Sequence, residues 1–158
     1  MADTTQCKRC DAPMRLQALD SVSGEDGVLK VVIRDFPVLQ CERGHRRFIA
    51  RDFPVRLLHE ISAREKSVLP AGKKQGLLFR KYHCGKCGAQ LAAESQPRPF
   101  EFDVELADAP QFHVALTVPV YQCSSCGQEQ LRDHGEIEGL APSALAQAFQ
   151  AAELKPEG

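Results

Sequence analysis

The sequence predicts a small α+β protein, mostly β, in which two tandem antiparallel β-ribbons are each followed by an α-helix. Three observations predict this fold: closely spaced pairs of cysteines, apolar residues that alternate with polar ones between the pairs, and an amphipathic stretch in each half. A chain of 158 residues, 43% of them hydrophobic, suffices for two small modules with thin cores. We expect modules at residues 1–69 and 77–158, joined by a linker at 70–76.

The seven cysteines predict a metal site in each ribbon. Three Cys-x2-Cys pairs and a single cysteine make eight ligands once a nearby histidine is added, which is enough for two tetrahedral sites. The predicted ligand sets are Cys7, Cys10, Cys41 and His45, and Cys84, Cys87, Cys123 and Cys126. Zinc favours sets of four thiolates or of three thiolates with one imidazole. We therefore expect two Zn²⁺ ions and two zinc ribbons, which unfold when the metal is removed.

The two predicted sites are not equally supported by the sequence. In the second, a glycine follows each Cys-x2-Cys turn, and the alternatives to a metal are disulfides or free thiols. In the first, Gly44 stands where a second cysteine would fall, and His45 follows it. His45 is either the fourth ligand or a solvated histidine in a basic loop. Competing imidazole donors elsewhere in the chain are His59, His83 and His134.

Alternation with a period of two predicts the strands of each ribbon. In the second half, apolar and polar residues alternate over Phe100–Leu106 and again over Phe112–Val120. The first half has shorter runs at Met14–Leu19 and Leu29–Ile33. The stretch Ser21–Gly27 between these runs is rich in small and polar residues, and it predicts the turn that joins them.

A helix is expected after each ribbon. Asp52 is a candidate N-cap with Pro54 in the first turn, and this helix should run to about Lys66. Pro142 is expected to open the second helix. We expect each helix to pack on its own ribbon through the apolar residues Leu57, Leu58 and Ile61 in the first and Leu145, Ala148, Phe149 and Ala152 in the second.

The two halves repeat each other around the third ligand, where Asp35–Cys41 reads DFPVLQC and Thr117–Cys123 reads TVPVYQC. Together with the paired cysteines and the following helix, this pattern resembles the YgiT-type zinc finger, the zinc-binding part of MqsA-like antitoxins. The resemblance is best over Cys84–Ala152 and weaker over Cys7–Ala63. It implies structural zinc at the matched cysteines and a small fold of ribbon plus helix.

The resemblance also bears on function. MqsA-like proteins carry a DNA-binding helix-turn-helix domain after the finger, and too few residues follow Pro142 to form one. We therefore expect this chain to share the finger's use as a protein-contact surface and not the repressor role.

Charge is distributed unevenly along the chain. The stretch Arg43–Lys81 is strongly basic and residues 94–158 are acidic, although the formal net charge of the whole chain is only −1. Basic side chains can neutralise phosphates, and the candidate contacts are Arg43, Arg46, Arg47 and Arg51. Against nucleic-acid binding, the stretch has few aromatic residues that could stack on bases. The alternative is attraction between the basic and acidic parts of the chain itself.

Other classes of protein find little support in the sequence. It contains no Gly-rich phosphate loop, no His-Glu-x-x-His motif and no nucleophile elbow, and two full ligand sets leave no open position for catalysis. No stretch approaches the length of a membrane span, and the first residues lack the features of a signal peptide, so we expect a cytoplasmic protein.

We therefore expect a non-enzymatic zinc protein that recognises another protein, as an adaptor or an antitoxin-like regulator. One alternative is a nucleic-acid-binding accessory protein that uses the Arg43–Lys81 segment. The other is a rubredoxin-like iron redox protein, which the absence of tryptophan disfavours because rubredoxins pack aromatic residues around the iron.

Overall fold

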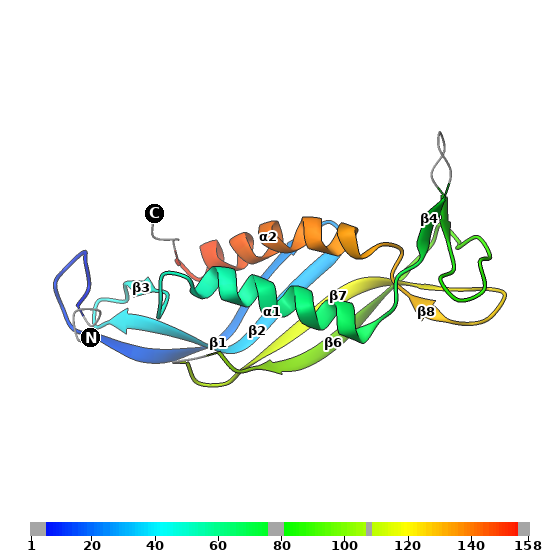
Figure 1. Cartoon of the computed structure of the whole chain (residues 1–158). Coiled ribbons are helices and arrows are strands. Elements are labelled where there is room, and N and C mark those ends of the chain that lie inside the picture. Colours follow the sequence, from blue (N-terminus) through cyan, green and yellow to red (C-terminus); the bar gives the residue numbers. More distant parts are fainter. Residues whose placement is uncertain (1–5, 76–80, 107–108, 155–158) are drawn as a thin grey trace.

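One antiparallel sheet carries both helices on the same face (Figure 1). This computed structural model describes residues 6–75, 81–106 and 109–154. The main sheet contains β1 (Met14–Asp26), β2 (Leu29–Cys41), β3 (Arg46–Arg47), β6 (Gln96–Val104), β7 (Phe112–Gln122) and β8 (Glu129–Gln130). A second, two-stranded sheet contains β4 (Lys73–Gln75) and β5 (Lys81–His83), and the helices are α1 (Phe53–Val68) and α2 (His134–Ala151). The small α+β fold, mostly β, is confirmed.

The ribbons of the two halves are joined edge to edge. The order of the four long strands is β1-β2-β7-β6, and β2 pairs with β7 in antiparallel register from Lys30–Thr117 to Arg34–His113. A two-stranded ribbon is marginal by itself, whereas four strands form a face broad enough to bury two helices. The expected pair of ribbons is therefore present, but as the two halves of one sheet.

The segment expected to be a linker belongs to the second metal centre. Residues Lys73–Gln75 form β4, which pairs with β5, and Leu131 exchanges backbone hydrogen bonds with Pro70 and Gly72 at 2.9 and 2.8 Å. Gly76, at the end of the expected linker, and 77–80, at the start of the expected second module, lie outside the described residues, as do the ends of both modules at 1–5 and 155–158.

The turn of the first ribbon is tighter than expected. β1 continues to Asp26 and β2 begins at Leu29, so the turn lies at Gly27, whose φ is +57°, and not across Ser21–Gly27. The small residues there serve packing. A Cβ atom on Gly24 would lie 2.1 Å from the backbone oxygen of Ala144 in α2, so glycine allows the helix to approach the strand closely.

α2 lies over the ribbon of the first half and α1 contacts both ribbons, contrary to the expectation that each helix packs on its own (Figure 1). α2 contacts β1 at Gly24, and the side chain of Gln147 in α2 accepts a hydrogen bond from the amide of Glu25 at 3.4 Å. The guanidinium of Arg64 in α1 lies over the ring of Phe102 in β6, 5.6 Å from its centroid. The joined sheet makes these contacts possible, because either helix can cross the boundary between the ribbons.

The starts of the two helices differ from expectation in different ways. α1 begins at Phe53 as expected, with Leu57 and Ile61 buried, but the side chain of Asp52 makes no capping hydrogen bond and pairs with Arg56 instead. α2 begins at His134 and contains Pro142 in its interior. The reason is an N-cap upstream, where the side chain of Asp133 accepts a hydrogen bond from the amide of Gly135 at 2.9 Å.

The core joins both halves at a cluster of phenylalanines. Phe36 of β2 is fully buried, and its ring contacts Phe53 of α1, Phe112 of β7 and Phe149 of α2 at centroid distances of 5.6, 5.6 and 5.9 Å. One core cluster of buried residues draws on both ribbons and both helices. The halves are therefore packed together through side chains as well as through the sheet.

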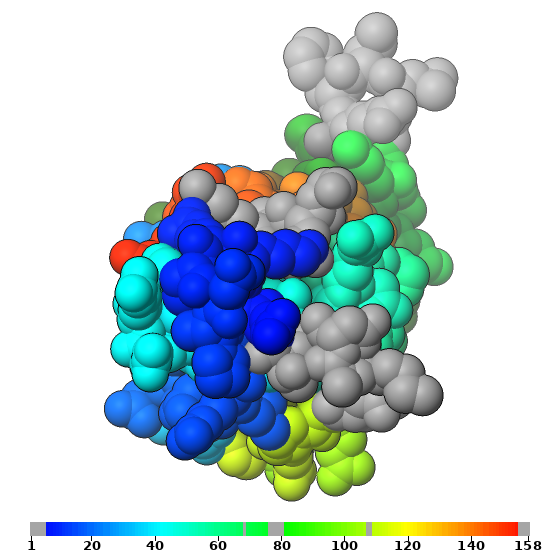
Figure 2. All heavy atoms as spheres, turned by 90° about the vertical axis from the view of Figure 1, so that its left-hand side faces the viewer, coloured from blue at the N-terminus to red at the C-terminus, as the bar shows by residue number. Residues whose placement is uncertain are grey.

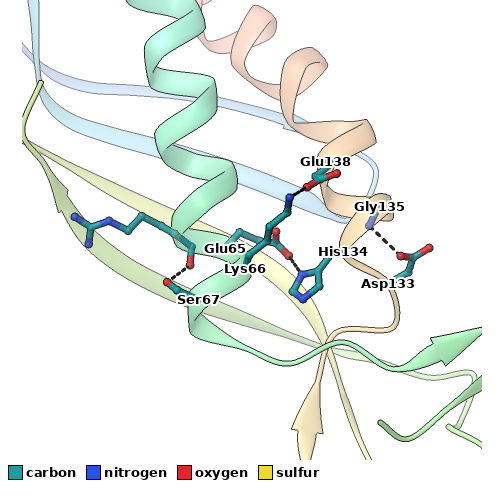
Figure 3. A network of polar contacts seen from close by, with 8 residues as sticks. Glu65, Lys66, Ser67, Asp133, His134, Gly135 and Glu138 are labelled. Carbon is teal, nitrogen blue, oxygen red and sulfur yellow. Dashed lines mark hydrogen bonds and ion pairs between the residues drawn. The ribbon is translucent and has the colours of Figure 1, made fainter.

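Polar contacts tie the end of α1 to the start of α2 (Figure 3). The buried carboxylate of Glu65 lies 2.8 Å from Nδ1 of His134, and Lys66 pairs with Glu138. Burial raises the pKa of Glu65, and the hydrogen bond with His134 opposes that rise. This network fixes the relative positions of the two helices at one end.

Neither helix in the described part of the chain combines the length and apolar character needed to cross a membrane.

Candidate metal centres

The eight predicted ligands gather into two clusters. In each cluster, the four ligand atoms lie within 4.8 Å of one another, so each could hold a metal ion. The clusters lie at opposite ends of the sheet (Figure 1). Cys41 ends β2 and Cys123 directly follows β7, and these antiparallel strands run in opposite directions. At about 3.3 Å per residue, this places the two clusters roughly 50 Å apart. A metal ion in one cluster would therefore hold together only its own end of the sheet.

The spacing of the sulfur atoms fits a tetrahedral metal. At a metal–sulfur bond of about 2.3 Å, two sulfurs of a tetrahedron are about 3.8 Å apart. The separation is 3.5 Å between Cys87 and Cys123, 3.6 Å between Cys84 and Cys126, and 3.8 Å between Cys10 and Cys41. A disulfide needs about 2.05 Å, and all seven cysteines are unbridged. The disulfide alternative therefore does not hold in this structure.

Three of the four ligand turns share one backbone geometry. In the turns that begin at Cys7, Cys84 and Cys123, the carbonyl of this cysteine accepts a hydrogen bond from the amide four residues later, at 2.8, 3.0 and 2.8 Å. The residue at that position has a left-handed backbone, with φ of +60° at Asp11, +81° at Gly88 and +78° at Gly127. Asp tolerates this conformation better than most residues, which explains why the first turn works without glycine.

The turn at Cys41 is one residue shorter, which explains how His45 reaches the first centre. The carbonyl of Cys41 accepts from Gly44, only three residues later, at 3.0 Å, and Gly44 is the left-handed residue with φ of +86°. His45 follows this glycine and places Nδ1 3.4 Å from the sulfur of Cys7. The cluster contains His45, and none of the competing histidines belongs to a ligand cluster in the described residues.

Hydrogen bonds shift the pKa values of the cysteine thiols in the second centre in different directions. The side chain of Gln130 lowers the pKa of Cys84 to about 5, and amide hydrogen bonds also lower the pKa of Cys123. The amide of Ala89 lowers the pKa of Cys87, but hydrogen bonds with the neighbouring sulfurs outweigh it and raise that pKa to about 11. Without a cation, the cluster thus keeps some sulfurs protonated beside thiolates, and a metal replaces those protons.

The first centre has a similar asymmetry. Burial raises the pKa of Cys7, but hydrogen bonds from the amides of Arg9 and Cys10 and from His45 outweigh burial and bring the pKa to about 6. The amide of Ala12 lowers the pKa of Cys10, but burial and the neighbouring sulfurs raise it overall. A thiolate is therefore available in each centre to bind a soft cation first.

Gln130 is a residue of the second centre that the sequence did not reveal. It lies in β8 and is fully buried, and its Nε2 donates to the sulfur of Cys84 at 3.2 Å. Its Oε1 accepts from the amide of Gly85 at 2.9 Å. The same side chain thus orients a ligand and stabilises the turn that carries it. Nothing in the sequence distinguishes it from Gln128 nearby, because only the fold decides which of the two points inward.

Replacing Gln130 with Leu should therefore weaken metal binding at the second centre by about 10- to 100-fold, the usual cost of losing such a supporting contact. Competition with a chromogenic zinc chelator measures the affinity of each centre. The first centre is an internal reference and should be unchanged, and Gln128→Leu is the matched control. Equal affinities for Gln130→Leu and the unaltered protein would show that the contact does not support the site.

The structure brings together three of the four candidate nucleic-acid contacts. Arg43, Arg46 and Arg47 line a pocket of about 600 Å³ beside the first centre, whereas Arg51 is not among the lining residues. The full lining is Cys7, Lys8, Arg9, Met14, Arg43, Gly44, His45, Arg46, Arg47, Gln150 and Glu153. Figure 2 looks onto this end, where the N-terminal segment lies beside the residues that follow β2.

Comparison with known proteins adds no assignment: no protein-family model, curated protein or solved structure matches this chain. The resemblance to YgiT-type fingers therefore stays a prediction from the sequence, and the two four-ligand clusters are the features on which a function can be argued.

Proposed function

We propose that this protein is a non-enzymatic zinc protein that recognises another protein. The ligand sets support zinc, because three thiolates with one imidazole and four thiolates are its usual structural sites. Each cluster supplies four side-chain ligands, enough to fill every position of a tetrahedral ion, which favours a structural role over catalysis. In this proposal the ions shape the two ends of the sheet, and the surface between them makes the contact.

The observation that carries the proposal is an apolar groove between the two helices. Its volume is about 300 Å³, and it is lined by Pro54, Val55, Leu58, Pro142, Leu145, Ala146, Phe149, Gln150 and Leu154. Gln150 is the single polar side chain in that lining. Val55 is 56% exposed, so one apolar side chain of the groove is available to a partner. Paired helices with an apolar groove between them are a common site for an apolar helix or chain segment of a partner.

Charged residues in this groove should abolish capture of the partner. In the double variant Val55→Glu and Ala146→Glu, both substituted residues are exposed, so the fold should remain intact while the groove becomes acidic. The measurement is quantitative pull-down from native lysate with zinc-loaded protein, and the captured protein should fall by at least tenfold. The control is Val28→Glu in the hairpin turn, where valine is also exposed at 49%.

The outcome of this pull-down shows whether the partner binds in the groove or elsewhere on the surface. Loss in the double variant with retention in the control supports the proposal. Equal capture by all three proteins places the contact elsewhere and overturns it. Sedimentation of the unaltered protein identifies the case in which the groove binds a second copy of the chain.

A further inference from the structure

We propose that the basic pocket at the N-terminal end, the 600 Å³ pocket beside the first centre, binds the phosphate group of a small molecule. Its walls come from three segments that are distant in sequence: the first ligand turn, the turn after β2 together with β3, and the end of α2. A concave space of this size is in the range of small-ligand sites. The inference is independent of the groove between the helices.

Positive charge dominates the lining of the basic pocket. Five cationic side chains, those of Lys8, Arg9, Arg43, Arg46 and Arg47, meet one carboxylate, that of Glu153. Arg46 is already engaged, because it donates to Gln40 at 2.9 Å and to the carbonyl of Ala152 at 3.1 Å. These bonds attach β3 to the end of α2 and form one wall. Even without Lys8 and Arg46, the three arginines Arg9, Arg43 and Arg47 outnumber the one carboxylate, and this excess of positive charge fits a multiply charged anion.

Arg47 provides the most specific feature. Its Nε and Nη2 are shielded from solvent and have no hydrogen-bond partner among the described residues. These two nitrogens form one edge of the guanidinium, which presents two parallel N–H groups in the geometry that pairs with two oxygens of a phosphate or carboxylate. Because neither nitrogen is exposed to the pocket in this conformation, the guanidinium must turn to present this edge to a ligand oxyanion, and in the described residues it has no hydrogen bond to break in doing so.

The chemistry of the lining favours a phosphorylated small molecule over a nucleic acid. The lining contains no Phe, Tyr or Trp on which a base could stack, and its one aromatic ring, the imidazole of His45, belongs to the first ligand cluster. A phosphate dianion carries more charge and more acceptor oxygens than a carboxylate, and it can engage several arginines at once. Arg9 and Arg43 meet this need, since both project from turns around the first centre.

The position of these two arginines links the pocket to the first metal centre. Arg9 lies between Cys7 and Cys10, and Arg43 lies between Cys41 and His45. The two turns meet because their four ligands converge. The structure therefore assigns the first centre an additional role, which is to hold together two walls of the basic pocket.

Isothermal titration of the zinc-loaded full chain with pyrophosphate, and with inorganic phosphate alongside it, tests this site. Arg47→Gln should weaken pyrophosphate binding by about tenfold or more, because it removes a bidentate charge-assisted contact. Arg34→Gln is the matched control, since it removes one exposed arginine outside the pocket and should leave the affinity unchanged. Cys41→Ser should also weaken binding, whereas Cys126→Ser at the opposite end should not.

Three results would overturn the proposal. The first is no binding of phosphate or pyrophosphate at millimolar concentration. The second is equal weakening by Arg47→Gln and Arg34→Gln, or by Cys41→Ser and Cys126→Ser. The third is a single-stranded oligonucleotide that binds more tightly than pyrophosphate and loses equal affinity with either arginine variant, since this would show a diffuse basic surface.

Discussion

Phe36→Ala is expected to lower the free energy of unfolding of the whole protein by about 3–5 kcal/mol, the range for removing a buried phenylalanine. Phe36 is fully buried in β2, and its ring contacts phenylalanines of α1, β7 and α2. The cavity would therefore open where both ribbons and both helices meet. Since most single domains have 5–15 kcal/mol of stability in total, the loss would be a large share of it.

Urea unfolding followed by circular dichroism and by exchange of individual amides measures this loss. Amides of β2 and β7 should lose protection together, because the two strands share a sheet and a core. Leu16→Ala is the control, since Leu16 is 52% exposed and its truncation should cost less than about 0.5 kcal/mol. Two separate transitions, with the second half unaffected by Phe36→Ala, would show that the halves fold independently.

Removing the metal ions should unfold the two ends of the sheet and leave its centre folded. Structural zinc contributes roughly 10–16 kcal/mol of apparent binding free energy in zinc-finger peptides, which is more than the small clusters around each centre can replace. Those clusters are small and separate from the main core, and their buried members are Cys7, Met14 and Cys41 at one end and Cys84, Leu91, Tyr121 and Cys123 at the other. The expectation from the sequence, that each whole ribbon unfolds, is therefore revised by the shared core.

Elemental analysis and hydrogen exchange check this result. The purified protein should contain two zinc ions per chain and little iron, matching its two four-ligand clusters. After chelation, the turn amides of Gly44, Gly88 and Gly127 should lose protection, whereas those of Val31 and Leu116 should keep it. Cys123→Ser should reproduce the loss at the second end alone. Loss of protection throughout the sheet would show that the core depends on the metal.

The ligand sets could be predicted from the sequence because they depend on local geometry. A Cys-x2-Cys turn brings two sulfurs together through a few residues of backbone, so its spacing is visible in the chain itself. The shortened turn at Cys41 is also visible in the sequence, since Gly44 and His45 stand where the second cysteine and its glycine would otherwise be. The strands of the second half followed from alternation for the same reason, because neighbouring residues determine the pattern.

Local signals misled where two of them competed. Pro142 is a good first-turn residue, yet Asp133 provides the cap and the helix runs through the proline. Small and polar residues between Ser21 and Gly27 are typical of a turn, but at Gly24 the missing side chain makes room for α2. In both cases the residue pattern is present in the sequence, but contacts in the folded protein determine which structure it forms.

The sequence by itself determined the two ligand sets, the α+β class and the basic character of the Arg43–Lys81 stretch. Only the tertiary structure decided that β2 pairs with β7, that both helices cross from one ribbon to the other, and that Gln130 supports Cys84. It also brought Arg9 and Arg47 to one pocket. The physical reason is that strand alternation shows which face of a ribbon is buried but not what buries it, because that choice depends on the apolar surface of the whole chain.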